Sequence, residues 1–212
     1  MANDDPDGSG GPIPVAELRD YHLINAEVVR RLDRGDRLVR LEGPSGQRLL
    51  LAGLAGSWDA VIEVAGDAGP ELAAGMDAPN VVVVCTGRSA DGAGAGMRSG
   101  TLLLLDPSGS ATGCRLAGGS LIAADAVGPR AGLGMSGGDL ILLGPVGPMA
   151  GDRQSGGRLF LPAEPAIPHA GREAVGGRRF AGDPGEGEAD ARQALAEARG
   201  LAARHGGSRQ ED

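Results

Sequence analysis

The sequence predicts an all-β fold, a parallel β-helix of about seven coils with 19–21 residues in each and one helix at either end. Two observations predict it. Short apolar blocks recur through residues 36–183 at a nearly constant interval, and glycines recur at fixed offsets from these blocks. Self-similarity at a fixed period is typical of a solenoid, and a helical repeat needs longer units with few glycines.

The apolar blocks define the repeat unit. They begin at residues 61, 81, 102, 121, 140, 159 and 179, and they read VIEV, VVVV, LLLL, LIAA, LILL, LFLP and RFAG. Five residues before every block but the first stands a matching position, occupied by Met76, Met97, Leu116, Met135, Gln154 and Ala174. Strand residues advance ~3.3 Å each and stacked strands lie ~4.8 Å apart, so each unit closes into one coil.

Alternation within the blocks predicts which side chains point into the coil. The second position of the blocks is never polar, whereas the first and third positions include Arg179 and Glu63. Because side chains alternate across a strand, we expect the second and fourth positions to point inward. This ladder contains Ile62, Val82, Leu103, Ile122, Ile141, Phe160 and Phe180.

The first and third positions would then form an apolar stripe on the outside. Monomers rarely expose such a patch, and the alanine-rich stripe of the C-terminal helix looks too small to cover five coils. We therefore expect the stripe to be largely a protein–protein interface. It contains Val81, Val83, Leu102, Leu104, Leu121, Ala123, Leu140, Leu142, Leu159 and Leu161.

The segments outside the repeat are short. Residues 1–14 are predicted to be a disordered tail, and residues 15–35 a helix that leads into the solenoid and ends at Gly35. Residues 184–212 hold a second helix, over 187–205, and another disordered tail. An open solenoid end invites edge-to-edge association, so we expect the two helices to cover the ends.

Composition excludes several classes of function. The net charge is −8, and the few aromatic residues do not accompany a basic face, so nucleic acid is not an expected partner. No apolar run approaches the length of a membrane span, and the acidic N-terminus does not resemble a signal peptide. Cys85 and Cys114 are expected to be free thiols, which together with these observations favours a cytoplasmic location.

The stretch GLGMSGGDLILLG, residues 132–144, matches two functional motifs. Gly132, Gly134 and Gly137 spell the dinucleotide fingerprint, but a strand follows them where that fingerprint requires a helix. Ser136 lies in G-x-S-x-G, the hydrolase elbow, which also requires a helix after the serine. His169 is the one histidine outside the predicted helices, so an esterase that uses Ser136 and His169 stays an alternative. Asp59, Asp67, Asp125 and Asp152 are spread over separate coils and are expected to be turn residues.

The repeats resemble a known family. The segments GDAGPELAAGM, GRSADGAGAGMRSG, GPRAGLGMSGGDLILLG and GPVGPMAGDRQSGG are similar to the G-x-G-x-G repeat domain, which ends the large chain of glutamate synthase. The domain also occurs as a separate subunit of glutamate-synthase-like enzymes such as N-methylglutamate synthase, and a related repeat forms one of the subunits of formylmethanofuran dehydrogenase. INAEVVRRL, residues 24–32, looks like the helix that leads into the domain where it is a separate subunit, and the likeness covers about residues 18 to 183.

The resemblance implies a right-handed parallel β-helix that has no catalytic, cofactor-binding or metal-binding residues of its own. It implies a scaffold subunit of an amidotransferase complex in nitrogen metabolism, an oxidoreductase as a whole. A glutaminase-type subunit and a synthase subunit with FMN and an iron–sulfur cluster would be the partners in a hetero-oligomer. The alternative within the family is the corresponding repeat component of a formylmethanofuran dehydrogenase or formyltransferase complex. Gln154 and Ala174 depart from the family pattern, which expects an apolar residue before the strand.

Overall fold

The computed structural model describes residues 11–18 and 20–206, so residues 1–10 of the predicted disordered tail over 1–14 and residues 207–212 lie outside the described residues. Within that predicted tail, Ile13 and Pro14 form a short strand of the sheet, and Ile13 is buried, so the prediction of disorder is wrong for these two residues. All strands belong to one parallel sheet in chain order. The described strands are β1 Ile13–Pro14, β2 Leu38–Gln47, β3 Ala60–Ala68, β4 Asp77–Cys85, β5 Ser99–Leu104, β6 Ser120–Ala123, β7 Asp139–Leu142, β8 Arg158–Leu161 and β9 Arg178–Ala181. The described helices are α1 Val15–Leu18, α2 Tyr21–Asp33 and α3 Ala189–Gly206.

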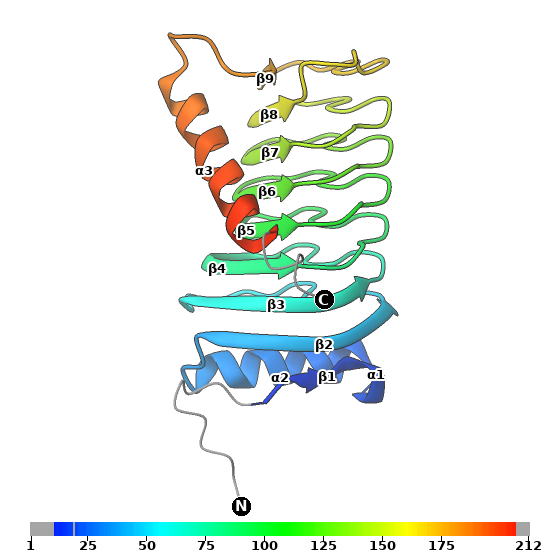
Figure 1. Cartoon of the computed structure of the whole chain (residues 1–212), viewed down its shortest axis with the longest axis vertical. Helices are drawn as coiled ribbons and strands as arrows, with labels where there is room; N and C mark the ends of the chain where they lie inside the picture. Colours follow the sequence, from blue (N-terminus) through cyan, green and yellow to red (C-terminus); the bar gives the residue numbers. More distant parts are fainter. Residues whose placement is uncertain (1–10, 19, 207–212) are drawn as a thin grey trace, which may run out of the picture.

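The fold is the predicted parallel β-solenoid. Each strand stacks on the strand of the next coil, from β2 near one end to β9 at the other (Figure 1). The register of the central coils follows the apolar blocks, with Leu102 opposite Leu121 and Leu140 opposite Leu159. The first coil is longer than these, because Leu38 lies opposite Val61. The expected coil length therefore holds for the later coils and fails at the first one.

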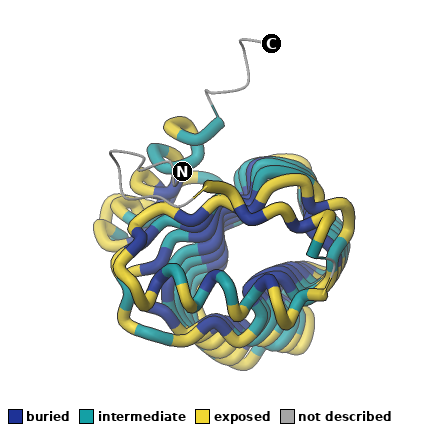
Figure 2. The backbone as a smooth tube through the Cα atoms, turned by 90° about the horizontal axis from the view of Figure 1, so that it is seen from below, coloured by how far each residue is buried: buried dark blue, intermediate teal, exposed yellow. Residues whose placement is uncertain are grey.

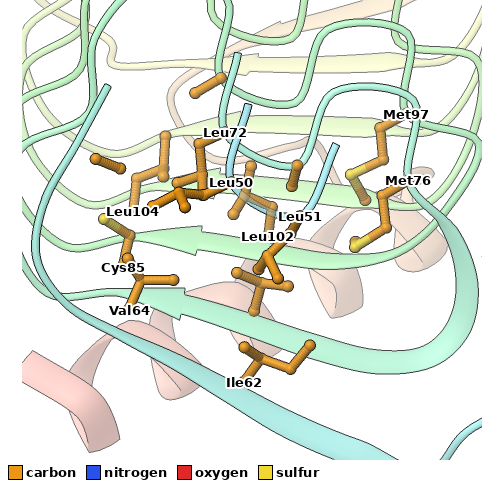
Figure 3. Packing of buried hydrophobic residues seen from close by; sticks show 14 of the residues in the cluster. Leu50, Leu51, Ile62, Val64, Leu72, Met76, Cys85, Met97, Leu102 and Leu104 are labelled. Carbon is orange, nitrogen blue, oxygen red and sulfur yellow. The ribbon is translucent and has the colours of Figure 1, made fainter. Parts of the chain in front are cut away.

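The side chains inside the solenoid are those that we expected outside. Val83, Leu102, Leu121, Leu140 and Leu159 are fully buried and form one column of the main core. Seen along the axis, the coils superimpose as a ring whose inner side carries most of the buried residues (Figure 2). Figure 3 shows part of this packing, including the columns through Leu102 and Leu104. The predicted facing is therefore wrong from β4 onward, and the stripe expected as an interface is the interior of the protein.

The error arises at the first block. Ala60, not Val61, lies opposite Val81, so the block VIEV is displaced by one residue relative to the others. A displacement of one residue reverses every side chain of a strand. Ile62 and Val64 do point inward, but they stack on Val83 and Cys85, which stand at the first-and-third parity of their coil. Glu63 consequently points outward, but it stacks on Val84, so its polarity does not indicate that the third positions of the later blocks point outward.

Glycines at the corner opposite the strands take the backbone conformation that the sequence predicts for them. In Gly92, Gly94 and Gly96 the φ angles are +76°, +66° and +66°, in the left-handed region that glycine adopts most readily. The N–H of Gly94 donates to Leu72 of the preceding coil, and those of Gly92 and Gly96 donate to Ser110 and Cys114 of the following coil. The same alternation recurs in every coil. Its other members are residues 49, 51 and 53; 71, 73 and 75; 111, 113 and 115; 130, 132 and 134; 149, 151 and 153; and 169, 171 and 173.

The N-terminal end of the solenoid is covered by α2, as predicted. Ile24, Val28 and Leu32 are buried in the main core, and the carboxamide of Asn25 accepts from the Leu51 N–H and donates to the Leu49 carbonyl. The predicted single helix over 15–35 is divided into α1 and α2. Asp20 separates them, because its extended backbone and its side chain, which accepts from the His22 N–H at 2.9 Å, form the N-cap of α2.

Stability of the α2 cap is expected to fall at low pH. Hydrogen bonds from Arg30 and then Arg31 lower the pKa of Glu27 from 4.5 to about 2. A carboxyl whose pKa is depressed by folding contributes stability above its unfolded pKa, and this contribution is lost as the pH falls from 4.5 toward about 2. In urea unfolding, the wild type should therefore lose more stability over this interval than Glu27→Gln. Parallel pH profiles for the two proteins would contradict the assignment.

The C-terminal end of the solenoid is closed by polar groups and not by a helix. Arg179 stacks on Leu159, so its side chain occupies the interior column of the last coil and donates to the Gln154 Oε1 at 3.0 Å. Gln154 is fully buried and donates to the carbonyls of Gly156 and Gly157. An inward-pointing charge protects an edge from pairing with another chain. α3 does not cover this end, in contrast to the prediction; it lies along the side of the solenoid (Figure 1).

None of the helices in the described ranges combines the length and the apolar character that a membrane span requires.

Candidate functional site

The outer face of the sheet, beneath α3, carries a second apolar cluster. Its column of side chains, which we call the outer ladder, consists of Val84, Leu103, Ile122, Ile141, Phe160 and Phe180. α3 packs on it through Ala191, Leu195 and Ala198, each of them at most 4% exposed. Figure 1 shows α3 crossing the strands from the level of β9 toward β4. Burial of a large aliphatic or aromatic side chain contributes about 1.5–3 kcal/mol, so this contact is a substantial second core.

The apolar character of the outer ladder coincides with the area that α3 covers. In the two coils before Val84, the same column holds Glu63 and Arg40, which form an ion pair at 2.7 Å in contact with water. A sheet with both faces covered has strands that are apolar on both faces. Small alanine side chains suffice for α3 because they let the helix approach the sheet closely. The chain therefore covers this face itself, and the expectation that the helix is too small is wrong.

Charged side chains hold the N-terminal end of α3 against the last three strands. Arg158 of β8 donates two hydrogen bonds to Asp139 of β7, both at 2.6 Å, and one to Asp190 of α3 at 3.0 Å. Arg178 of β9 also donates to Asp190 at 3.0 Å and pairs with Glu188. The hydrogen bond from Arg178 lowers the pKa of Asp190, and the bonds to Asp139 raise the pKa of Arg158. We call this group the α3 latch.

Beyond the latch, α3 and the sheet enclose a groove of about 560 Å³. Its floor carries the side chains of Thr101, Ser120 and Ile122, and its helix side carries Gln193, Glu197 and Arg204. The two sides meet in an ion pair between Arg158 and Asp190. No hydrogen bond of the described residues crosses between Thr101 or Ser120 and α3. The groove is thus closed at one end by the latch and lined by polar and apolar groups along the rest.

A second hollow, of about 500 Å³, lies between α2 and the first coil. Its lining is mostly apolar, with Val29 of α2 facing Leu51 and Leu54 of the coil. Asp33 at its rim accepts from the Trp58 Nε1 at 2.9 Å, which ties the end of α2 to the coil. Among the described residues that line this hollow there is no histidine, serine or cysteine.

Three comparisons bear on identity. Searches of protein-family models, of curated proteins and of solved structures find no match to this chain. The resemblance to the G-x-G-x-G repeat therefore rests on the quoted segments alone.

The structure does not bring Ser136 and His169 together. Ser136 is exposed just before β7, whereas His169 is exposed two coils further on, at the position that stacks on Met149 and Arg130, with φ +57°. Within the described residues, neither side chain forms a hydrogen bond with the other or with a carboxylate. A nucleophilic serine requires a base within hydrogen-bond distance. The geometry gives the esterase alternative no support.

The glycines of residues 132–137 have no free amides for a phosphate. The N–H of Gly132 donates to the Thr112 carbonyl at 2.8 Å, and that of Gly134 donates to the Asp152 carbonyl at 2.7 Å. The Gly137 N–H donates to Leu116 at 3.2 Å, and the segment continues into strand β7. Dinucleotide sites need such amides pointing at the pyrophosphate from a helix N-terminus. The G-x-G-x-x-G match is therefore part of the solenoid backbone.

Other candidate groups are dispersed. Asp125 accepts the Ala126 N–H in a turn, as predicted, whereas Asp67 lies in β3 and accepts the Arg88 N–H of the next coil, so it is not a turn residue. One buried oxygen of Asp152 has no partner in the described structure. No group of three or more His, Cys, Asp or Glu side chains suited to a metal ion occurs in the described residues. Both cysteines are free, and burial raises the pKa of the Cys85 thiol to about 11, so that thiol is unreactive at neutral pH.

Ser136→Ala is expected to leave any ester hydrolysis unchanged. Within the described residues, no base forms a hydrogen bond with the Ser136 hydroxyl, so this hydroxyl is not activated as a nucleophile. Its removal should therefore not change the rate. The measurement compares release of p-nitrophenol from p-nitrophenyl acetate by wild type and variant at equal concentration. A rate that falls at least tenfold in the variant would restore the hydrolase.

The outer groove and the α3 latch were not predicted from the sequence. Asp139, Arg158, Arg178 and Asp190 stand in the sequence as ordinary surface charges, and their spacing matches no motif. One signal was available in the sequence. Asp139, Arg158 and Arg178 each stand one residue before an apolar block, so the spacing of the blocks places these three side chains in one column.

Proposed function

We propose that this chain is a scaffold subunit of a glutamate-synthase-like amidotransferase complex and has no reaction centre of its own. It would pack between a glutaminase-type subunit and an FMN-binding synthase subunit. The observation that carries the proposal is the G-x-G-x-G corner, where every second residue has a positive φ in consecutive coils. The resemblance to the repeat family rests on those same positions.

The distribution of polar groups supports a role in assembly. The glycine motifs donate their amides to neighbouring coils, and the serine and histidine that could have formed a hydrolase lie in different coils. The charged side chains of the outer face, Arg158 and Arg178, bond to Asp190 of α3 and thereby hold this helix on the sheet. These features fit a protein whose contribution to a complex is shape and contact surface.

The cofactors of such a complex would belong to a partner subunit. An iron–sulfur cluster is usually held by four cysteine thiolates, and this chain has two cysteines, of which Cys85 is buried in the core. The outer groove contains no aromatic side chain that could stack on a flavin ring. FMN and the cluster are therefore assigned to the synthase subunit in this proposal.

The test is the identity of the proteins that form a stable complex with this chain. An affinity-tagged copy, expressed in its native cells and purified through two columns, should carry a glutaminase-type chain and an FMN-binding chain in fixed proportion. A molybdopterin-containing or formyltransferase chain in their place would favour the formylmethanofuran-type alternative. A pure chain that binds FMN or releases ammonia from glutamine without partners would contradict the proposal.

A further inference from the structure

A hollow of about 340 Å³ lies at the G-x-G-x-G corner, in the three coils that lead into β7, β8 and β9. We call it the corner pocket. Its volume falls within the range of about 300–1,000 Å³ that is typical of pockets for small molecules. Its charged lining consists of Arg130, Asp152, Arg153, Arg172 and Glu173. No residue of α3 or of the outer ladder takes part in it, so it is separate from the groove described above.

Asp152 has an acceptor that the fold itself does not use. One of its carboxylate oxygens, Oδ1, is buried and accepts no hydrogen bond in the described structure. Such a group is costly, and native proteins keep few of them. The coil does not require a carboxylate here, because the equivalent residue of the first three coils is alanine, at Ala52, Ala74 and Ala95. Asp152 therefore calls for a role other than forming the corner.

Arg130 is a second group of the corner pocket that the fold leaves without a partner. Within the described residues, its guanidinium takes part in no hydrogen bond or ion pair. The other two arginines are partly neutralised, because Glu173 accepts from Arg153 at 3.1 Å and lies 3.8 Å from Arg172. Arg153 has a φ of +55° at a position that glycine occupies in four other coils, so its side chain is placed here at a cost in backbone strain.

The unpaired groups of the corner pocket are thus one carboxylate and one guanidinium, and a molecule with both charges complements them. An ammonium group donates to a carboxylate, and a second carboxylate accepts from a guanidinium through two parallel hydrogen bonds. Phosphate is less suitable, because its negative charges would also meet Asp152 and Glu173. Leu133 and Met149 complete the lining with an apolar wall that suits an aliphatic side chain.

We propose that the corner pocket binds a free aliphatic α-amino acid, whose ammonium group donates to Asp152 and whose carboxylate accepts from Arg130. The ligand reaches the buried Oδ1 when an arginine side chain of the rim moves aside. Arg153 and Arg172 are 68% and 62% exposed, and exposed side chains change rotamer rapidly. The site does not depend on the scaffold function proposed above, and it gives a chain without a reaction centre a small-molecule ligand.

Isothermal titration calorimetry of the full-length protein with L-leucine tests the class of ligand. The wild type should bind one L-leucine per chain. N-acetyl-L-leucine lacks the ammonium group and 3-methylbutylamine lacks the carboxylate, so each should bind at least about tenfold more weakly, as expected for loss of one charge-assisted pair. Failure to approach saturation at about 10 mM L-leucine would overturn the proposal. Tighter binding of inorganic phosphate than of L-leucine would do the same, because the pocket would then be an anion site.

Asp152→Ala distinguishes a ligand-binding carboxylate from a structural one. It places at residue 152 the side chain that the first three coils carry there, so the thermal midpoint should stay the same or rise while L-leucine binds at least about tenfold more weakly. Arg130→Gln should weaken binding to a similar extent. Arg115→Gln is the matched control, because Arg115 shares the φ of +55° with Arg153 but lies outside the pocket, and it should bind like the wild type.

Two results with these variants would overturn the inference and leave the scaffold function untouched. A lower thermal midpoint of Asp152→Ala would mean that the carboxylate serves the fold. Unchanged binding of L-leucine by both Asp152→Ala and Arg130→Gln would mean that the amino acid binds elsewhere on the protein.

Discussion

Replacing Leu140 by aspartate is expected to prevent folding, whereas the same replacement at Ile141 should leave the solenoid folded and release α3. Leu140 is fully buried in the middle of the solenoid interior, between Leu121 and Leu159. A carboxylate there has no partner, and an unpaired buried charge costs several kcal/mol in addition to the roughly 2–5 kcal/mol of a lost leucine. That sum is comparable to or larger than the free energy of unfolding of a typical domain, which is roughly 5–15 kcal/mol.

Ile141 is equally buried, but its cover is different. It points to the outside of the coil, and α3 is what separates it from water. Detachment of α3 would expose an aspartate at this position to solvent, so the cost is limited to the loss of the helix contact. Circular dichroism and size-exclusion chromatography should show a folded Ile141→Asp protein, with residues 189–206 sensitive to protease. If both substitutions prevented folding, or if neither did, the assignment of Leu140 to the interior of the coil and of Ile141 to the face beneath α3 would be wrong.

Gly137→Ala is expected to destabilise the protein by about 3 kcal/mol or more, at the upper end of the usual cost of overpacking. A Cβ at residue 137 would lie 2.1 Å from the carbonyl oxygen of Ala117 in the preceding coil. The obstacle is backbone, and it cannot move without breaking the hydrogen bonds that join the coils. Gly118 and Gly156 stand in the same place in their coils, with the same 2.1 Å approach. In a protein of this size, the thermal midpoint should fall by about 6–12 °C.

Gly134→Ala is the matched control for this substitution. Gly134 has a φ of +66°, yet a Cβ there would meet nothing closer than 3.9 Å. Its cost is therefore that of a left-handed alanine alone, about 1–2 kcal/mol. Neighbouring coils already place arginine in this position, with Arg115 and Arg153 at φ +55°. A larger loss for Gly134→Ala than for Gly137→Ala in urea unfolding would refute the assignment of Gly137 to a close contact between coils.

The period of the repeat could be predicted from the sequence because every coil has the same local conformational requirements. Every coil needs left-handed residues at its corner, and glycine recurs where that conformation or a close approach is required, as at Gly94 and Gly137. The strand that follows each corner needs apolar side chains, so the blocks from Leu102 to Leu159 kept their spacing and their register. These are short-range requirements, and a single sequence records them.

The facing of the strands and the place of α3 depend on contacts between residues far apart in the chain. Leu140 and Ile141 are both apolar, because one packs inside the coil and the other beneath a helix that begins almost fifty residues later. An alternating pattern marks the interior only when one face meets water, and here neither does over the coils that α3 covers. For the same reason the α3 latch joins Asp139, Arg158 and Asp190 from three separate elements, a grouping that no spacing along the chain could indicate.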